Sequence, residues 1–143
     1  KDTKLDPFSP KAALKILRSH GWEDKNQDGV LEKDGRNLEF TVLFGEANPL
    51  SILTMFQADA ALAGIRINLK QIDWTVINQR LKKGEFDALY TDWGPGPVEF
   101  DPKTFWHSTS SYEKGGLNFM GYKNEVVDRL MERMLLTTDF EKR

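Results

Sequence analysis

The stretch Leu38–Leu69, LEFTVLFGEANPLSILTMFQADAALAGIRINL, decides the fold of this chain. Its first seven residues alternate apolar with polar side chains, apart from an extra Leu43, which predicts a β-strand covered on both faces. Asn48 and Pro49 then supply a capping side chain and a proline for the first helical turn, and Gly64 ends the predicted helix. The alternation returns at Ile65. The stretch therefore predicts two strands joined by a helix, with a buried helical stripe of Leu53, Phe56, Ala60 and Ala63.

The same alternation of elements continues on both sides of this stretch. Asp73 caps a further predicted helix that ends at Gly84, and FDALY, residues 86–90, reads as a short third strand. Strands separated by helices predict a mostly parallel sheet flanked by helices, which is the α/β class. Upstream, Ser9 and Pro10 open a helix, and the turn at Asp34 and Gly35 predicts a small hairpin whose partner strand is 38–44. A last helix is capped by Asn124.

Composition narrows the possible functions. The chain has 143 residues, a net charge of −2 and no cysteine. One domain of this length can bury a sizeable core, the weak charge argues against nucleic acid as a partner, and the lack of thiols excludes disulfides and thiolate metal sites. The sequence begins at Lys1 without a methionine and ends in DFEKR, so we expect it to be a piece of a longer protein.

The segment after the third predicted strand carries the first candidate for a binding site. Residues 90–102 read YTDWGPGPVEFDP, with Trp93 just past the strand and two Gly-Pro pairs after it. Ligands of open parallel sheets bind outside the carboxyl ends of the strands, and glycine and proline there suppress regular structure. Trp93 is therefore a candidate ligand contact, and the alternative is an indole that only fills the core.

Several segments, in this order and spacing, resemble the extracytoplasmic solute-binding proteins of oligopeptide and dipeptide ABC importers. The segments are HGW (20–22), NQDGVLEKDG (26–35), AGIRINL (63–69), IDW (72–74), GEFDALYTDW (84–93), the late DP…WHS (101–108) and GYKNEVVDRL (121–130). The resemblance implies a type II periplasmic-binding-protein-like fold, in which residues 1–143 form, as a single domain, most of the carboxyl-terminal lobe. It also implies an absent amino-terminal lobe, a permease partner in the inner membrane, and a periplasmic or extracellular membrane-anchored location.

The resemblance also assigns roles to individual residues. Trp74 and Trp93 match family tryptophans that line pockets for ligand side chains, and an indole gives a large, rigid contact surface. Tyr90 and Asn48 stand near ligand-contacting positions. An aspartate that pairs with the α-amino group of peptides in the family corresponds here to Gly96, so Asp101 or Glu99 is the candidate substitute. The alternative for Asp101 is that, with Pro102, it sets up the next turn.

The position where some dipeptide carriers place an arginine for the peptide carboxylate also differs. Residues 45–49 of this sequence contain no basic side chain. A short peptide is the expected ligand, and a nickel chelate, a sugar or another small solute is the alternative within the same architecture.

Metal binding and catalysis have little support in the sequence. Asp24, Asn26 and Asp28 match the first half of an EF-hand loop, but the twelfth position is Gly35 instead of glutamate; the alternative is a turn held by Asx side chains. No nucleophile motif, phosphate loop or dinucleotide fingerprint is present, so we predict no catalytic residue, no metal and no cofactor. The leading hypothesis is a transport binding module that closes its lobes on a solute; the alternative is a small α/β enzyme or a regulatory ligand-sensing domain that uses the same cleft.

Overall fold

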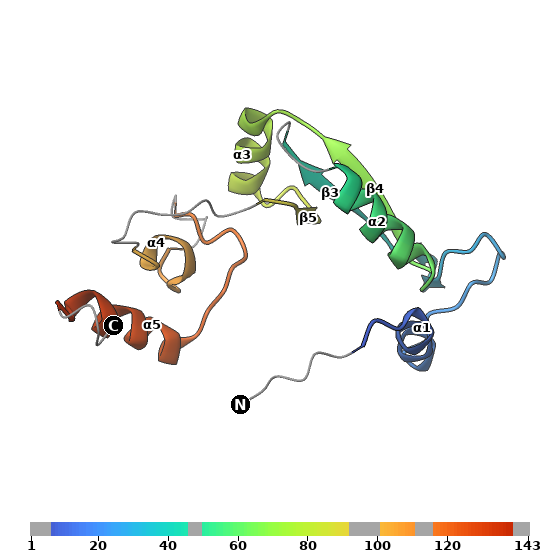
Figure 1. The fold of residues 1–143 in the computed structure, drawn as a ribbon, viewed down its shortest axis with the longest axis horizontal. Helices are drawn as coiled ribbons and strands as arrows, with labels where there is room; N and C mark the ends of the chain where they lie inside the picture. The colour runs from blue at the N-terminus through green and yellow to red at the C-terminus, as the bar shows by residue number, and fades with distance from the viewer. Residues whose placement is uncertain (1–6, 46–49, 92–100, 111–115, 139–143) are drawn as a thin grey trace. The chain divides into compact units, whose positions relative to one another are not determined.

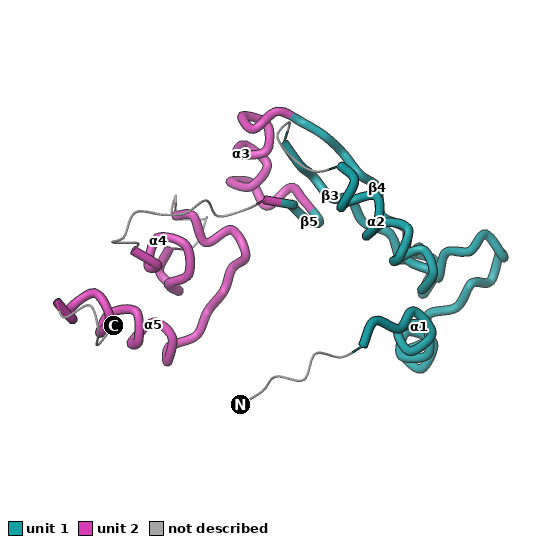
Figure 2. Tube along the Cα trace, in the orientation of Figure 1, with its two compact units in different colours: residues 1–72, 87–90 teal, residues 73–86, 91–143 magenta. Residues whose placement is uncertain are grey.

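A computed structural model describes residues 7–45, 50–91, 101–110 and 116–138 of the chain and divides the chain into two compact units (Figure 2). The first unit contains residues up to Ile72 together with Asp87–Tyr90, and the second contains Asp73–Phe86 and the residues from Thr91 onward. The assignment of residues 1–143 to a single lobe stays a prediction.

The first unit is built on a parallel sheet of three strands. Strands β3 (Glu39–Phe44), β4 (Arg66–Gln71) and β5 (Ala88–Leu89) lie in the order β4-β3-β5, and both neighbours run parallel to β3. Helix α2 (Leu50–Ala61) joins β3 to β4 and lies along the sheet (Figure 1). The predicted α/β class and the parallel strand order are confirmed. The predicted helix cap at Asn48 and Pro49 lies outside the described residues.

The core of this unit forms where α2 covers one face of the sheet. Its buried members are Val42, Phe44, Leu53, Ala60 and Ile67, with Tyr90 and other half-buried side chains packed against them. The predicted helical stripe is wrong at Phe56, which is 52% exposed. Gln57 takes the inward position instead, because its side-chain amide donates to the carbonyl of Ile67 at 2.6 Å and its polar group is thereby satisfied.

A two-stranded antiparallel hairpin precedes the sheet. Strands β1 (Glu32–Lys33) and β2 (Arg36–Asn37) pair across a turn in which Asp34 and Gly35 both have positive φ, 52° and 74°. Such a turn matches the twist of a hairpin and favours Asp-Gly. The predicted turn is confirmed. The predicted partner strand is wrong, because β2 is the second strand of the hairpin, whereas residues 39–44 form β3, the central strand of the parallel sheet.

Helix α1 (Pro10–Ser19) begins the described part of the first unit, and the Ser9 hydroxyl caps it by accepting from the backbone N–H of Ala12 at 3.3 Å. The second unit contains helices α3 (Trp74–Lys83), α4 (Lys103–Trp106) and α5 (Glu125–Leu136), and α4 packs against α5. Asn124 caps α5 by accepting from the N–H groups of Val126 and Val127. The predicted caps at Ser9, Asp73 and Asn124 are therefore confirmed.

Candidate ligand-binding site

The carboxyl ends of the three parallel strands reach the same edge of the sheet. The last residues of β3 and β4, Phe44 and Gln71, are paired, and Leu89 at the end of β5 pairs with Leu43. The backbone N–H of Ile72 donates to the carbonyl of Phe44 at 3.0 Å, and that of Tyr90 donates to the carbonyl of Leu43 at 2.9 Å. Since crevices at this edge are where open α/β sheets bind ligands, the segments that follow the strands are the first candidates for a site.

The predicted contact residues follow those strand ends closely in the chain. Asn48 is four residues after β3, Trp74 is three residues after β4, and Tyr90 and Trp93 are one and four residues after β5. Asn48 and Trp93 lie outside the described residues, as does Glu99.

Tyr90 is half-buried and packs against the hydrophobic cluster of the first unit. Tyr90 therefore contributes to the core. A contact with ligand would use the part of the side chain that the core leaves exposed, and it stays a prediction.

Trp74 is the first residue of α3, in the second unit, and 39% of it is exposed. Asp73 fixes the start of this helix, because its carboxylate accepts from the N–H of Thr75 at 2.7 Å. Hydrogen bonds from the side chain and backbone of Thr75 hold the pKa of Asp73 below its ordinary value. Ile77 and Leu81 anchor the helix by burial. The indole of Trp74 is therefore attached to an anchored helix and has exposed surface available for contact.

Asp101 is exposed, and its Oδ1 accepts from the backbone N–H of Lys103 at 2.9 Å at the start of α4. This is the turn-forming role that the sequence offered as the alternative to ligand contact. The hydrogen bond to Lys103 uses one carboxylate oxygen and leaves the other as an acceptor, so the two roles are compatible.

The Asp24–Gly29 segment is a turn held by its own side chains. The N–H of Asp28 donates to Asp24 and to Asn26, the N–H of Gly29 donates to Asp24, and the N–H of Val30 donates to Asp28, at 2.9 to 3.1 Å. These bonds are the Asx alternative stated from the sequence. Within the described residues no group of three or more histidine, aspartate or glutamate side chains is placed to hold a metal ion.

A polar network in the second unit was not predicted. Asn118 is fully buried and bonds the carbonyls of His107 and Tyr122 through Nδ2 and the N–H of Tyr122 through Oδ1. His107 is also buried: its Nδ1 accepts from the N–H of Thr109, and its Nε2 lies 3.4 Å from Glu132 Oε1 without hydrogen-bond geometry. No sequence signal marked Asn118, because it stands in an aperiodic, glycine-rich stretch.

Asp128 on α5 ties this network to the segment after α4, since it accepts from the N–H of Ser108 at 3.0 Å. The hydroxyl and backbone N–H of Ser108 lower the pKa of Asp128. The network holds α4 to α5 and has no arrangement of nucleophile and base that would suggest catalysis.

None of the helices in the described part of the chain combines the length and the apolar character needed to cross a bilayer.

The comparison of sequences and the comparison of structures both match this chain to the same protein. The oligopeptide-binding protein AppA of Bacillus subtilis is 30% identical over 131 residues, which cover 87% of this chain and 23% of that protein. The structure of AppA in complex with a nonapeptide superposes with a TM-score of 0.73 at 28% identity, covering 99% of this chain and 29% of that one. NikZ of Campylobacter jejuni in complex with Ni(L-His) gives a TM-score of 0.72 at 27% identity, covering 98% and 28%.

This chain therefore spans about a quarter of the length of those relatives, 23% in the sequence match. Both relatives superpose over nearly the whole of this chain, and their bound ligands, a nonapeptide and a nickel–histidine complex, differ in chemistry. The family model of bacterial extracellular solute-binding proteins, family 5 Middle, matches residues 1–116. With a match over most of its length, the chain belongs to the bacterial extracellular solute-binding proteins of family 5.

Proposed function

We propose that this chain is part of the substrate-binding component of an ABC importer, which captures a short peptide or a related small solute and delivers it to a membrane permease. The observation that carries the proposal is the match of residues 1–116 to a family of extracellular solute-binding proteins, on a sheet whose three strands end at one edge. The family consists of transport binding proteins and its members are extracellular or periplasmic. Binding without catalysis is proposed for this chain on that ground.

The whole chain is proposed to form most of the carboxyl-terminal lobe, with the ligand held between it and an amino-terminal lobe. The relatives are several times longer than this chain, which supports the split. The proposed mechanism is lobe closure: bound solute shifts the open–closed equilibrium by its greater affinity for the closed form. The proposed location of the parent protein is the periplasm or the outer face of the membrane, free or lipid-anchored.

The proposed ligand contacts are Trp74, Trp93, Tyr90, Asn48 and Asp101. Trp74 has the most direct support, because its indole is partly exposed on a capped helix. Asp101 is supported by its exposed carboxylate, which would pair with the α-amino group of a peptide. Asn48 and Trp93 are supported by their places in the sequence after β3 and β5.

Ligand identity and the split site are tested together. The intact parent is purified and its bound solute is identified by mass spectrometry, and the parent and the 143-residue chain are then melted with a set of short peptides and with a nickel–histidine complex. We expect a peptide at a hundred times its Kd to stabilise the parent by about 2.7 kcal/mol and to leave the isolated chain nearly unchanged. Equal stabilisation of the isolated chain would reject the two-lobe site, and binding of neither class would reject the carrier function as proposed.

The contact role of Trp74 is tested in the parent with Trp74→Ala. We expect the peptide Kd to rise about tenfold or more, because a large contact surface is lost, with little change in the melting temperature of the ligand-free protein. Val76→Ala is the matched control, since Val76 lies on the same helix and is 40% exposed. If the two variants bind peptide equally well, Trp74 is not a ligand contact.

A further inference from the structure

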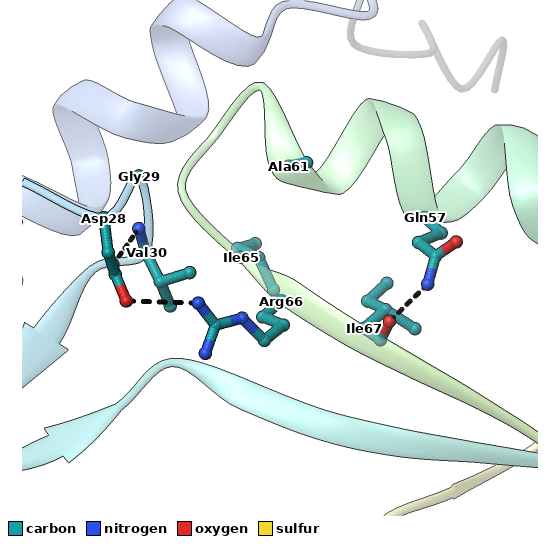
Figure 3. A pocket seen from close by; sticks show the side chains of 8 residues that line it. All are labelled: Asp28, Gly29, Val30, Gln57, Ala61, Ile65, Arg66 and Ile67. Atoms are coloured by element: carbon teal, nitrogen blue, oxygen red, sulfur yellow. Dashed lines mark hydrogen bonds and ion pairs between the residues drawn. The ribbon is translucent and has the colours of Figure 1, made fainter.

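Helix α2 is apolar on more than the side that covers the sheet. Its inner side carries Leu53 and Ala60, which are buried, and Gln57, whose amide donates to a carbonyl of β4 (Figure 3). Gln57 also lines a cavity of about 370 Å³, together with residues that include Asp28, Arg66 and Ile67. The sheet therefore accounts for the inner side of the helix, and the outer side has no such partner within the described residues.

The outer side of α2 exposes four large apolar side chains. Ile52, Met55 and Phe56 are 53%, 67% and 52% exposed, and Leu62, just after the last residue of the helix, is 64% exposed. Residues three and four apart are neighbours on a helix surface, so the first three form one cluster. The N–H of Leu62 donates to the carbonyl of Ala58 at 3.4 Å, so Leu62 keeps the helical spacing and continues the cluster. We call these four side chains the outer stripe.

An exposed apolar stripe of this kind is typical of an interface. A helix at the surface of a soluble protein normally turns polar side chains outward, and a helix that is apolar on opposite sides is normally buried on both. Contiguous exposed apolar patches mark surfaces that contact another part or another molecule. Ser51 and Thr54, which are exposed, separate the outer stripe from the inner side on one flank of the helix. A partner that covers the stripe would therefore lie along one line of α2.

Asp59 places one charge within the outer stripe. It is three residues after Phe56 and three residues before Leu62, and this spacing puts it on the same side of the helix. The residue is exposed, and within the part of the chain that the structure describes its carboxylate has no hydrogen-bond or ion-pair partner. A carboxylate that is covered without a partner is costly. A surface that covers the stripe therefore has to be apolar and to present a lysine or an arginine to Asp59.

The same carboxylate argues against a second copy of the chain as the partner. Two copies of α2 that pack antiparallel about a twofold axis would bring Asp59 close to its own counterpart, because Asp59 is near the middle of the stripe, and like charges repel. A further segment of the parent protein fits better. The chain covers only 23% of AppA in the sequence match and 29% in the structural match, and a covalently connected segment meets the stripe at a high effective concentration.

We propose that the outer stripe of α2, with Asp59, is the surface on which the parent protein packs a segment from outside residues 1–143. That segment presents apolar side chains to the stripe and one lysine or arginine to Asp59. The contact joins the first unit to the rest of the parent on the side of α2 that faces away from the sheet. The inference rests on the proposal that the parent is longer than this chain, and it does not depend on the solute that the parent carries.

Photo-crosslinking in the solute-free parent identifies what covers the stripe. The photoreactive residue p-benzoylphenylalanine replaces Phe56 in one variant and, as the matched control, Thr54 on the flank of the same helix in another; the crosslinked peptides are identified by mass spectrometry. We expect the Phe56 position to crosslink to a segment outside residues 1–143 that contains lysine or arginine, with a yield at least about tenfold above that of the Thr54 position, because crosslinking requires contact. Crosslinks to the second unit or to another copy of the protein would overturn the proposal, as would equal yields from the two positions.

Cysteine modification tests the cover and its charge. Met55→Cys is introduced into the solute-free parent, and the reaction of position 55 with a maleimide is followed by mass spectrometry of the peptide that contains it. We expect this reaction to be at least about a hundredfold slower than in the urea-unfolded parent, because a covered stripe is exposed only by local opening. Adding Asp59→Lys should speed the reaction about tenfold, since two cations then face each other, whereas adding Thr54→Lys should leave the rate unchanged.

Equal rates in the native and the unfolded parent would reject the covered stripe, and equal effects of the two lysine substitutions would reject the cation opposite Asp59. Both measurements are made without solute, so their outcome is separate from that of the transport proposal. A parent that binds no peptide still gives the crosslink if the stripe is covered. A parent that binds peptide does not give it if the stripe is open.

Discussion

Asn118 is the clearest case of a single side chain that holds together residues distant in the chain. It is fully buried, and its side-chain amide forms hydrogen bonds with the carbonyl of His107 and with both the carbonyl and the N–H of Tyr122. Buried amides of this kind are stabilising only while every polar group has a partner. The residue therefore fixes how the segment before α5 meets the end of α4.

Asn118→Ala is expected to lower the free energy of unfolding by about 2–4 kcal/mol, because the backbone groups of His107 and Tyr122 lose their partners inside the unit. Urea unfolding measures the change. Asn78→Ala, at an exposed position of α3, is the control and should change stability by less than about 0.5 kcal/mol. A similar small effect for both variants would mean that water replaces the Asn118 amide at no cost.

Trp74 and Tyr90 differ in how much of the side chain is available for contact with a ligand. Both are aromatic residues near strand ends, but Tyr90 packs on the core, whereas Trp74 keeps 39% of its surface exposed. Their proposed roles as ligand contacts therefore rest on different amounts of available surface.

At the scale of elements, the connection between α2 and β4 depends on Gly64. Its φ is +76°, its carbonyl accepts from the N–H of Leu31 at 2.8 Å, and a Cβ at this position would lie 2.6 Å from Leu31 Cγ. Leu31 itself is 2% exposed and has little room to move. The glycine thus joins the hairpin to the parallel sheet both by a hydrogen bond and by close approach.

Gly64→Ala is expected to destabilise the protein by about 2–4 kcal/mol, the sum of a left-handed backbone penalty and an overpacked contact with Leu31. Gly35→Ala is the matched variant, because Gly35 has φ +74° with open space around it, and it should cost only about 1 kcal/mol. Thermal or urea unfolding compares the two. Equal costs would show that Leu31 yields to the methyl group and that only the backbone conformation matters.

For the whole molecule, three carboxylates make stability depend on pH. The folded state lowers the pKa of Asp28, Asp73 and Asp128, chiefly through hydrogen bonds from Val30, Thr75 and Ser108 respectively. Each carboxylate binds a proton more readily in the unfolded chain, so unfolding takes up protons at acid pH. This contribution is fully present above the ordinary aspartate pKa of about 3.9 and is lost as the pH falls through the lowered values.

The urea midpoint is therefore expected to be lower at about pH 3 than at about pH 7. Asp128→Asn should reduce the difference between the two midpoints, since that position no longer titrates. Asn78→Ala, at an exposed position of α3 that carries no titratable group, serves as the control and should leave the difference as it is. A midpoint that is independent of pH over this range would contradict the inferred hydrogen bonds to the three carboxylates.

Local chemistry made much of the fold predictable. Capping by Ser9, Asp73 and Asn124, the end of α3 at Gly84, and the Asp-Gly turn of the hairpin depend on neighbours within a few residues, and all are confirmed. The order of strands and helices predicted parallel pairing for the same reason, because strands joined by helices return in the same direction.

Predictions that depended on partners far along the chain were less successful. The predicted second strand of the hairpin was wrong because the alternation of apolar and polar side chains in residues 39–44 is compatible with either a hairpin or a parallel sheet. The prediction that Phe56 is buried was wrong because α2 is apolar around most of its circumference. Leu50, Ile52 and Met55 are also exposed, so the apolar pattern of the helix does not define one inner face. The choice of Gln57 as an inward residue required the carbonyl of Ile67, ten residues away.

The sequence by itself determined the α/β class, the helix ends and the family, since each follows from local backbone chemistry or from the order of short segments. Tertiary structure alone decided that β3 is central between β4 and β5, that Asn118 and His107 are buried, and that Asp28, Arg66 and Ile67 surround one cavity. These features bring together groups that are far apart in the chain, and no local pattern of side chains specifies which distant group each will meet.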